Sequence, residues 1–181
     1  MYLFIYLRAY IKMKKQKYTK KIIIITGTPC TGKTLIAKKL SLLLRMKYLD
    51  VNSLIIKKKL YSGYDKARNT KIVPLKPLIA ELKNIIRKSE GLIIDSHLSH
   101  FLPVKLVDLC IVTKCSLKEL KKRLEKRNYS SQKVRENIDS EIFDICLSEA
   151  HEQGHKILII DTSSKINFSN IIIKINEKLF Q

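Results

Sequence analysis

Short, unbroken runs of apolar residues alternate along this chain with longer segments in which apolar residues recur every three or four positions. The short runs predict strands over residues 21–26, 47–51, 91–95, 107–113 and 156–162, and the continuous β-branched run over residues 21–26 predicts a strand buried on both faces. The periodic segments predict helices over residues 34–46, 53–60, 74–89, 117–127, 132–153 and 170–180. This alternation favours one α/β domain, built on a mainly parallel five-stranded sheet with helices on both faces.

Two local features refine this expectation. On the helix over residues 34–46, the inner face is predicted to carry Leu35, Ala37, Leu40, Leu43 and Leu44. Residues 61–73 (YSGYDKARNTKIV) are polar and show neither periodicity, so they predict a loop or a small insert.

The segment GTPCTGKT, residues 27–34, lies between the first predicted strand and the first helix, and it fits the phosphate-loop pattern G-x-x-x-x-G-K-[ST]. Gly27 and Gly32 permit backbone turns that let successive N–H groups point at phosphate oxygens, and the helix N-terminus adds its positive dipole end. Lys33 supplies a charge for the β- and γ-phosphates, and Thr34 offers its hydroxyl to Mg²⁺. The motif therefore predicts a nucleoside triphosphate site, against the alternative of an ordinary turn with a solvated lysine.

A second candidate group follows the strand over residues 91–95. Asp95 ends this strand, so its carboxylate is expected at the C-terminal edge of the sheet, where it can hold a magnesium-bound water or accept a proton. His97 comes two residues later, within reach of the same phosphates or water. The alternatives are an aspartate that caps a turn and a surface histidine. A metal site formed by His97 and His100 has little support, because no cysteine or carboxylate completes it at a suitable spacing.

Arg123 and Arg127 lie four residues apart on one predicted helix face, beside an irregular polar stretch. Mobile guanidinium groups can neutralise the charge of a transferring phosphoryl group when a lid closes. The alternative is a solvated basic helix face in which Glu119 and Glu125 are the partners.

Composition limits the class of protein. The chain has 181 residues, 45% of them apolar, which excludes a disordered chain, and four cysteines without a C-x-x-C pair, which exclude a disulfide scaffold and a zinc ribbon and favour an intracellular protein. The net charge of +20 comes from 29 lysines and only 7 arginines. Compositional drift toward Lys and Ile, or attraction to RNA or ribosomal surfaces, can account for such a bias.

Residues 1–20 are predicted to form a basic extension, outside a single domain over residues 21–181. Their apolar part is too short to span a bilayer and is interrupted by Arg8, and it lacks the order of a signal peptide. Met13 as the true initiator and a real arm that touches membrane or RNA are both compatible with this composition. No other stretch approaches the length of a membrane span.

Four segments taken together, GTPCTGKT, DSHLSHFLP, RLEKRNYSSQKVRENIDSEIFD and the late IIDTS, resemble the adenylate kinase isoenzyme six family over residues 21–162. This resemblance implies a P-loop nucleoside monophosphate (NMP) kinase fold with an NMP-binding segment over residues 50–73 and a lid over residues 126–136. It implies that ATP is contacted by Cys30, Gly32, Lys33, Thr34, Leu35 and Arg127. It also implies a Walker B-type role for Asp95 and makes His97 the histidine of the family's D-x-H.

The family's activity is transfer of a phosphoryl group from ATP to AMP or another NMP, with Mg²⁺, together with ATPase activity and a part in small ribosomal subunit maturation. The resemblance thus implies a cytoplasmic, monomeric enzyme whose partners are a small-subunit precursor and one small-subunit ribosomal protein. Three positions depart from the family pattern: Cys30 replaces a glycine, lysines follow Ile56 where an arginine is common, and Asn128 replaces the lid glycine. Asn128 tolerates a left-handed turn.

Three functions remain open from the sequence. The first is a broad-specificity NMP kinase of the adenylate kinase type. The second is a ribosome-assembly ATPase in which water accepts the phosphoryl group, favoured by the altered NMP segment and the net charge. The third is another small-molecule P-loop kinase.

Overall fold

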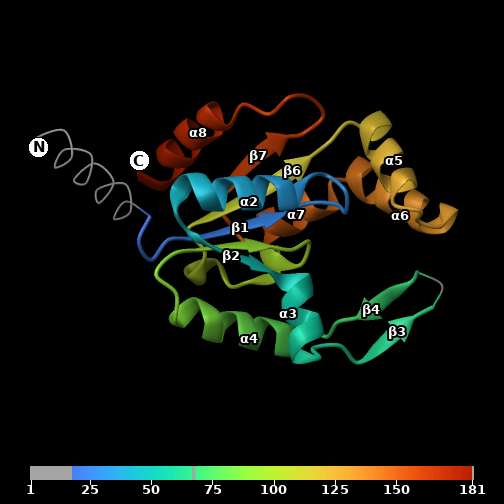
Figure 1. The fold of residues 1–181 in the computed structure, drawn as a ribbon, viewed down its shortest axis with the longest axis horizontal. Coiled ribbons are helices and arrows are strands. Elements are labelled where there is room, and N and C mark those ends of the chain that lie inside the picture. The colour runs from blue at the N-terminus through green and yellow to red at the C-terminus, as the bar shows by residue number, and fades with distance from the viewer. Residues whose placement is uncertain (1–17, 67, 181) are drawn as a thin grey trace, which may run out of the picture.

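The sheet at the centre of the molecule has the predicted number of strands, and they run in the predicted parallel direction. A computed structural model describes residues 18–66 and 68–180, and Figure 1 shows a central sheet between helical layers. Its strand order is β2-β5-β1-β6-β7, and every neighbouring pair is parallel. The strands are β1 (Ile22–Thr26), β2 (Lys47–Asp50), β5 (Leu92–Asp95), β6 (Leu109–Lys114) and β7 (Ile157–Asp161). The prediction of a five-stranded parallel sheet is confirmed.

Successive residues of β1 belong to two different hydrophobic cores. Ile23 and Ile25 pack in the core beneath α2 (Lys33–Leu44) and α8 (Phe168–Phe180). Ile22 and Ile24 pack in the core beneath α3 (Val51–Lys58), α4 (Leu75–Arg87) and α7 (Ile145–Glu152). This alternation follows from the two-residue period of a strand, and it explains why the unbroken isoleucine run forms a strand buried on both faces. Helices therefore cover both faces of the sheet, as predicted.

The helices differ from the predicted segments mainly at their ends. They are α2 (Lys33–Leu44), α3 (Val51–Lys58), α4 (Leu75–Arg87), α5 (Leu117–Lys126), α6 (Ser131–Ile142), α7 (Ile145–Glu152) and α8 (Phe168–Phe180), with short 3₁₀ turns at η1 (Ser99–Phe101) and η2 (Val104–Leu106).

The single long helix predicted over residues 132–153 is wrong. The chain forms α6 and α7 instead, because Asp144 adopts a left-handed backbone conformation (φ 52°) that ends the helical path. The Asp144 carboxylate pairs with Lys114 at the end of β6. The residue that separates α6 from α7 thus also binds the end of β6, and helical periodicity does not reveal this break in the helix.

The predicted inner face of α2 is correct for Ala37, Leu40 and Leu44 and wrong for two leucines. Leu35 and Leu43 are 60% and 41% exposed, and Ile36 is buried in their place. The helix begins at Lys33 and turns Ile36 toward the sheet. Leu35 therefore lies beside the cleft described below.

The polar segment over residues 61–73 contains a hairpin of two short antiparallel strands, β3 (Gly63–Asp65) and β4 (Thr70–Ile72). The predicted N-terminal extension lies outside the described residues up to residue 17. Tyr18, which that prediction placed in the extension, packs in the core with 6% exposure and donates its hydroxyl to Asn176 Oδ1 at 2.6 Å. Within residues 18–66 and 68–180, no helix has the length and apolar character needed to cross a membrane.

Candidate functional site

The phosphate loop connects β1 to α2 and depends on its glycines. Gly27 has φ +135°, and a Cβ at this position would lie 2.4 Å from the carbonyl oxygen of Thr113, so only glycine fits. Gly32 has φ +91° and serves as the N-cap of α2 without a side-chain capping bond. The first N–H groups of α2 therefore have no side-chain acceptor, which is the arrangement that binds anions.

Lys33 lies across the mouth of this loop. Its Nζ donates hydrogen bonds to the carbonyl oxygens of Gly27 at 2.8 Å and Thr28 at 2.9 Å. Burial lowers the pKa of Lys33 from its ordinary value, and the negative charge of Asp95 partly opposes this change. The ammonium is thus held by neutral carbonyls, so its charge is not cancelled by a paired carboxylate.

Asp95 meets two hydroxyl groups from other elements. Its carboxylate is 5% exposed, and one oxygen, Oδ2, accepts hydrogen bonds from Thr34 Oγ1 at 2.7 Å and from Tyr48 OH at 3.0 Å. The parallel register brings these groups together, because Asp95 lies opposite Ile25 of β1 and Asp50 of β2. Burial and the neighbouring Asp95 charge raise the pKa of Tyr48, so its hydroxyl stays protonated and donates.

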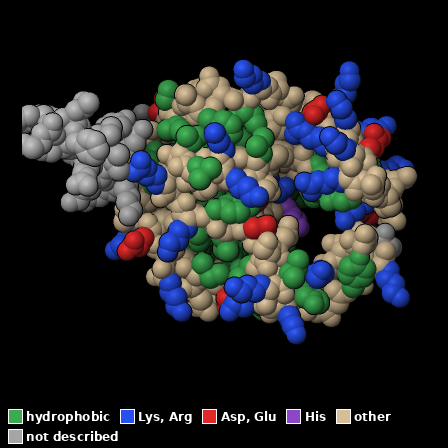
Figure 2. Space-filling model, in the orientation of Figure 1, with side chains coloured by type: hydrophobic (Ala, Val, Ile, Leu, Met, Phe, Trp, Pro, Cys, Tyr) green, Lys and Arg blue, Asp and Glu red, His purple; other side chains and the backbone are tan. Residues whose placement is uncertain are grey.

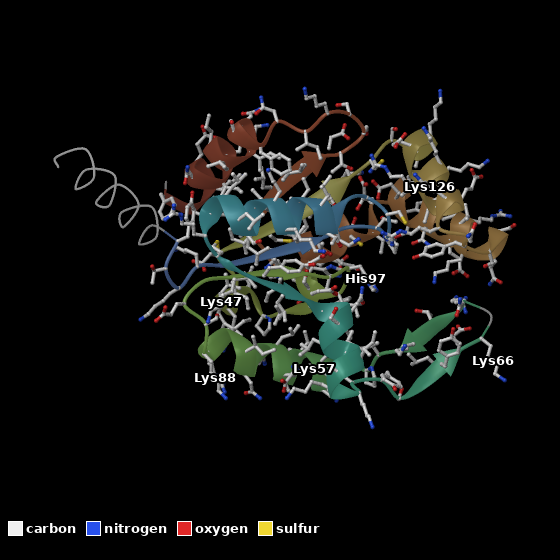
Figure 3. All side chains as sticks on the ribbon, viewed as in Figure 1. Lys47, Lys57, Lys66, Lys88, His97 and Lys126 are labelled. Carbon is white, nitrogen blue, oxygen red and sulfur yellow. The ribbon has the colours of Figure 1, made fainter. Side chains whose placement is uncertain are left out.

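A cleft of about 1130 Å³ opens over this edge of the sheet. Figure 2 shows it as a hollow between the hairpin side and the α5–α6 side, with a histidine at its edge, and Figure 3 places His97 there. Of the predicted site residues, those that line the cleft are Cys30, Gly32, Lys33, Thr34, Leu35, Asp95, His97 and Arg127. Gly27 does not line the cleft; it packs against Thr113.

The lining of the cleft is strongly basic. Six basic residues contribute to it, namely Lys33, Arg123, Lys126, Arg127, Lys133 and Lys165, whereas Asp95 is the one carboxylate among the described residues that line it. The walls extend from Asn52 and Thr70 on the hairpin side to Ser164 and Phe168 on the other. A long cavity of this charge suits a polyanion such as a nucleotide phosphate chain.

His97 is exposed to the cleft, and the neighbouring protein atoms displace much of the water around its ring. Desolvation by these neighbours, followed by the charges of Lys33 and Lys133, lowers its pKa to about 4. The imidazole is therefore neutral at pH 7 and can donate or accept a hydrogen bond without adding charge.

Arg123 and Arg127 have different surroundings. Arg123 Nε donates to Glu119 at 3.0 Å, while its other nitrogens donate to the carbonyl oxygen of Thr162 at 2.7 Å and to Thr162 Oγ1 at 3.1 Å. Thr162 in turn donates to the carbonyl oxygen of Thr31 in the phosphate loop at 2.7 Å. Arg127 caps α5 and is exposed to the cleft, and among the described carboxylates none lies within ion-pair distance of it.

His100 has no part in the cleft. It is 1% exposed, its Nδ1 lies 2.7 Å from Thr26 Oγ1, and its Nε2 lies 2.9 Å from a Glu149 oxygen. Burial lowers its pKa to about 4. No group of three potential metal ligands occurs among the described residues.

The hairpin reaches across the cleft to α6. Arg68 NH2 lies 3.0 Å from Glu136 Oε1, and Lys133 Nζ donates to the carbonyl oxygen of Arg68 at 2.9 Å. Arg68 also pairs with Asp65 on its own hairpin at 3.0 Å. We call this contact between the hairpin tip and α6 the clasp.

Sequence reasoning missed Tyr48 and Thr162. Tyr48 reaches Asp95 only through the pairing of β2 with β5, and Thr162 reaches the loop from the end of β7. For Thr162 a signal was available, because it ends the strand predicted over residues 156–162, and parallel sheets assemble their sites at such ends. Tyr48 lies near the start of its strand, so no such signal marked it. The left-handed conformation expected for Asn128 is observed, at φ 54°.

Known proteins resemble this chain in fold and in sequence. A family model described as an AAA domain matches residues 23–144, and the shikimate kinase of Acinetobacter baumannii superposes with a TM-score of 0.66 at 13% identity, covering 93% of this chain and 99% of that one. The fold, the phosphate loop and the relatives define a P-loop nucleotide kinase. A protein of Methanocaldococcus jannaschii named "Putative adenylate kinase" is 38% identical over 157 residues, 87% of this chain and 85% of that protein. The "Adenylate kinase isoenzyme 6 homolog" of Dictyostelium discoideum is 33% identical over 148 residues, 82% of this chain and 84% of that protein. The chain belongs to the adenylate kinase isoenzyme six family.

Proposed function

We propose that this protein transfers the γ-phosphoryl group of ATP to a nucleoside monophosphate, AMP or another NMP. The observation that carries the proposal is the continuous cleft of about 1130 Å³, which extends from the phosphate loop to the hairpin with six basic residues along it. Such a cavity has room for donor and acceptor together. The names of the relatives support an adenylate kinase activity.

The phosphate loop holds the donor. The N–H groups at the start of α2 bind the phosphates, among them those of Lys33, Thr34 and Leu35, and the Cys30 N–H contributes from the loop. Lys33 Nζ exchanges its carbonyl partners, 2.8 and 2.9 Å away, for the β- and γ-phosphate oxygens. Because these partners are neutral, the exchange breaks no ion pair.

Thr34 and Asp95 suit a magnesium ion. Their side-chain oxygens lie 2.7 Å apart at the mouth of the loop, and hard oxygen donors are the ligands that Mg²⁺ prefers. Thr34 would bind the ion through its hydroxyl and Asp95 through a water, while Tyr48 keeps the carboxylate in place. The ion, when bound, neutralises charge on the β- and γ-phosphates.

The lid cations complete the site. A phosphate oxygen of the acceptor attacks the γ-phosphorus in line, the bond to the β-γ bridging oxygen breaks, and ADP leaves with its charge on that oxygen. Arg127, together with Arg123 and Lys133, neutralises the equatorial oxygens during transfer. His97 is neutral and orients an acceptor phosphate or a water by hydrogen bonding.

A second activity, ATP hydrolysis, is favoured by the acceptor side. Lys57, Lys58 and Lys59, which replace the arginine typical of the family, are exposed and are absent from the described lining of the cleft, and Figure 3 shows Lys57 on α3, away from His97. The acceptor phosphate thus meets fewer cations, and water can take its place. We propose that this ATPase activity serves maturation of the small ribosomal subunit in the cytoplasm, with a subunit precursor and one of its proteins as partners.

The test measures the products of ATP with Mg²⁺ and a panel of NMPs. We expect ADP and the NDP to form together without inorganic phosphate in the kinase reaction, whereas hydrolysis releases phosphate without any NMP. Lys33→Ala serves as the background. Wild-type conversion of NMP to NDP that stays at this background for every NMP would refute the kinase proposal.

A further inference from the structure

The outer face of the β3–β4 hairpin carries aromatic and basic side chains that the proposed reaction does not use. Tyr64 lies directly opposite Lys71 in the antiparallel pair, so both side chains point to the same face. Thr70, the preceding residue of β4, lines the cleft. Because successive residues of a strand point to opposite faces, Tyr64 and Lys71 point away from the cleft.

Both tyrosines of this face are available to a partner. Tyr61 and Tyr64 are 40% and 52% exposed. The ammonium of Lys71 lies over the Tyr61 ring, 5.4 Å from its centroid. An exposed ring with a cation at its face is a surface on which a nucleobase can stack beside a phosphate.

Exposed lysines precede the hairpin in the chain and lie at its tip. Lys57 and Lys59 at the end of α3 and Lys66 at the hairpin tip are exposed, and no ion pair with a carboxylate is found for them among residues 18–66 and 68–180. Figure 3 shows Lys57 and Lys66 on this side of the molecule. Lys58 is partly neutralised, because Glu81 lies 3.5 Å from its Nζ. The local excess of positive charge complements a phosphate backbone.

We propose that this face, defined by Lys57, Lys59, Tyr61, Tyr64, Lys66 and Lys71, binds single-stranded RNA. Unpaired bases stack on Tyr61 and Tyr64, and the lysines contact the flanking phosphates. The hydroxyls of Tyr61 and Tyr64 offer hydrogen bonds to ribose 2′-hydroxyl groups, which favours RNA over DNA. A duplex fits poorly, because its bases are already stacked. RNA can bind this face without phosphoryl transfer in the cleft.

The clasp links this face to the cleft. The hairpin that carries the tyrosines also holds α6 through Arg68 and Glu136, 3.0 Å apart. A nucleotide that moves α6 therefore also moves the RNA-binding face and changes the affinity for RNA. By linkage, RNA changes the affinity for that nucleotide by the same factor.

The test uses the full chain and a fluorescein-labelled, unstructured RNA of about 12 nucleotides, a length within known single-strand site sizes. Fluorescence anisotropy gives the affinity over a series of salt concentrations. We expect Tyr61→Leu and Tyr64→Leu each to weaken binding about tenfold, because each removes one stacking surface. We expect the triple change of Lys57, Lys58 and Lys59 to Gln to weaken binding and to reduce the salt dependence.

The matched control changes Lys118, Lys121 and Lys122 of α5 to Gln, which removes the same charge from another exposed surface. Equal weakening by the two triple variants would overturn the proposal, because it would show attraction to net charge alone. Wild-type affinity in both tyrosine variants would also overturn it, as would equal affinity for DNA or for duplex RNA of the same length.

A crosslinking experiment on the unaltered protein covers the case in which a variant fails to fold. RNA that contains 4-thiouridine is irradiated in the complex, and mass spectrometry locates the attached peptide. Crosslinks at residues 61–64 support the proposal, and crosslinks confined to other surfaces overturn it.

Discussion

Removal of one hydroxyl group, in Tyr48→Phe, tests whether Asp95 must be held in place. The Tyr48 hydroxyl donates to Asp95 Oδ2 at 3.0 Å, and the carboxylate is 5% exposed. A hydrogen bond to a charged group contributes about 1.5–3 kcal/mol, and because Tyr48 is only half-buried we use the lower figure, about 1.5 kcal/mol. Thr34 still donates to the same oxygen in the variant, so the carboxylate retains one partner.

This free energy should be visible in both stability and activity. For a protein of this size, about 1.5 kcal/mol corresponds to a fall in Tm of about 3–6 °C. We expect the bond to strengthen in the transition state, where Asp95 must hold the magnesium-bound water, so that kcat/KM for ATP falls as well; a strengthening of about 1.4 kcal/mol corresponds to a tenfold fall. Thermal unfolding and a coupled ADP assay at saturating Mg²⁺ measure the two effects on the same preparation.

Tyr18→Phe is the matched control. It also removes one hydroxyl, whose bond to Asn176 Oδ1 is 2.6 Å long and lies in the core beneath α2 and α8. We expect it to lower Tm and leave kcat/KM unchanged. The reasoning fails if Tyr48→Phe keeps the wild-type kcat/KM, or if Tyr18→Phe lowers it by the same factor.

Three further changes test other parts of the structure. Gly27→Ala places a Cβ only 2.4 Å from the carbonyl oxygen of Thr113, on a residue whose φ is +135°. We expect the free energy of unfolding to fall by more than about 2 kcal/mol, as measured by urea denaturation. The pKa of His100 is about 4 in the folded protein and about 6.5 when unfolded, so the unfolded chain binds more protons between these values and stability falls as pH drops from about 6.5 to 4. His100→Asn should flatten that fall, by on the order of 1–3 kcal/mol, whereas an unchanged pH profile would contradict the assignment. Arg68→Ala breaks the ion pair with Glu136; because both groups are exposed, we expect almost no change in stability but a raised KM for the acceptor, and an unchanged KM would show that the clasp does not assist acceptor binding.

The sheet could be predicted because each strand carries its signal locally. The run Ile22–Thr26 is buried on both faces, so apolar residues occupy every position and no alternation is needed to recognise it. The hairpin could not be predicted in the same way. Gly63–Asp65 and Thr70–Ile72 are short and none of their residues is buried, so no buried face imposes a pattern on them.

The candidate site divides along a similar line. The loop from Gly27 to Thr34 is continuous in the sequence and its spacing follows from backbone geometry, so a pattern of eight residues was sufficient to place it. Tyr48 and Thr162 reach the same site through strand register and through the end of β7. Only the three-dimensional pairing of strands brings them near, and a single sequence does not contain that information in local form.

The net charge of +20 gains a more specific meaning from the placement of Lys33 and Asp95. These two opposite charges lie in the same cleft, and a direct ion pair between them would cancel the groups that phosphates and Mg²⁺ require. The structure keeps them apart by giving each neutral partners: carbonyl oxygens of Gly27 and Thr28 for the ammonium, and hydroxyls of Thr34 and Tyr48 for the carboxylate. Neutral partners can be exchanged for a ligand without separating charges. The catalytic potential of the cleft therefore depends less on the number of lysines in the chain than on the neutral groups that hold one lysine and one aspartate ready.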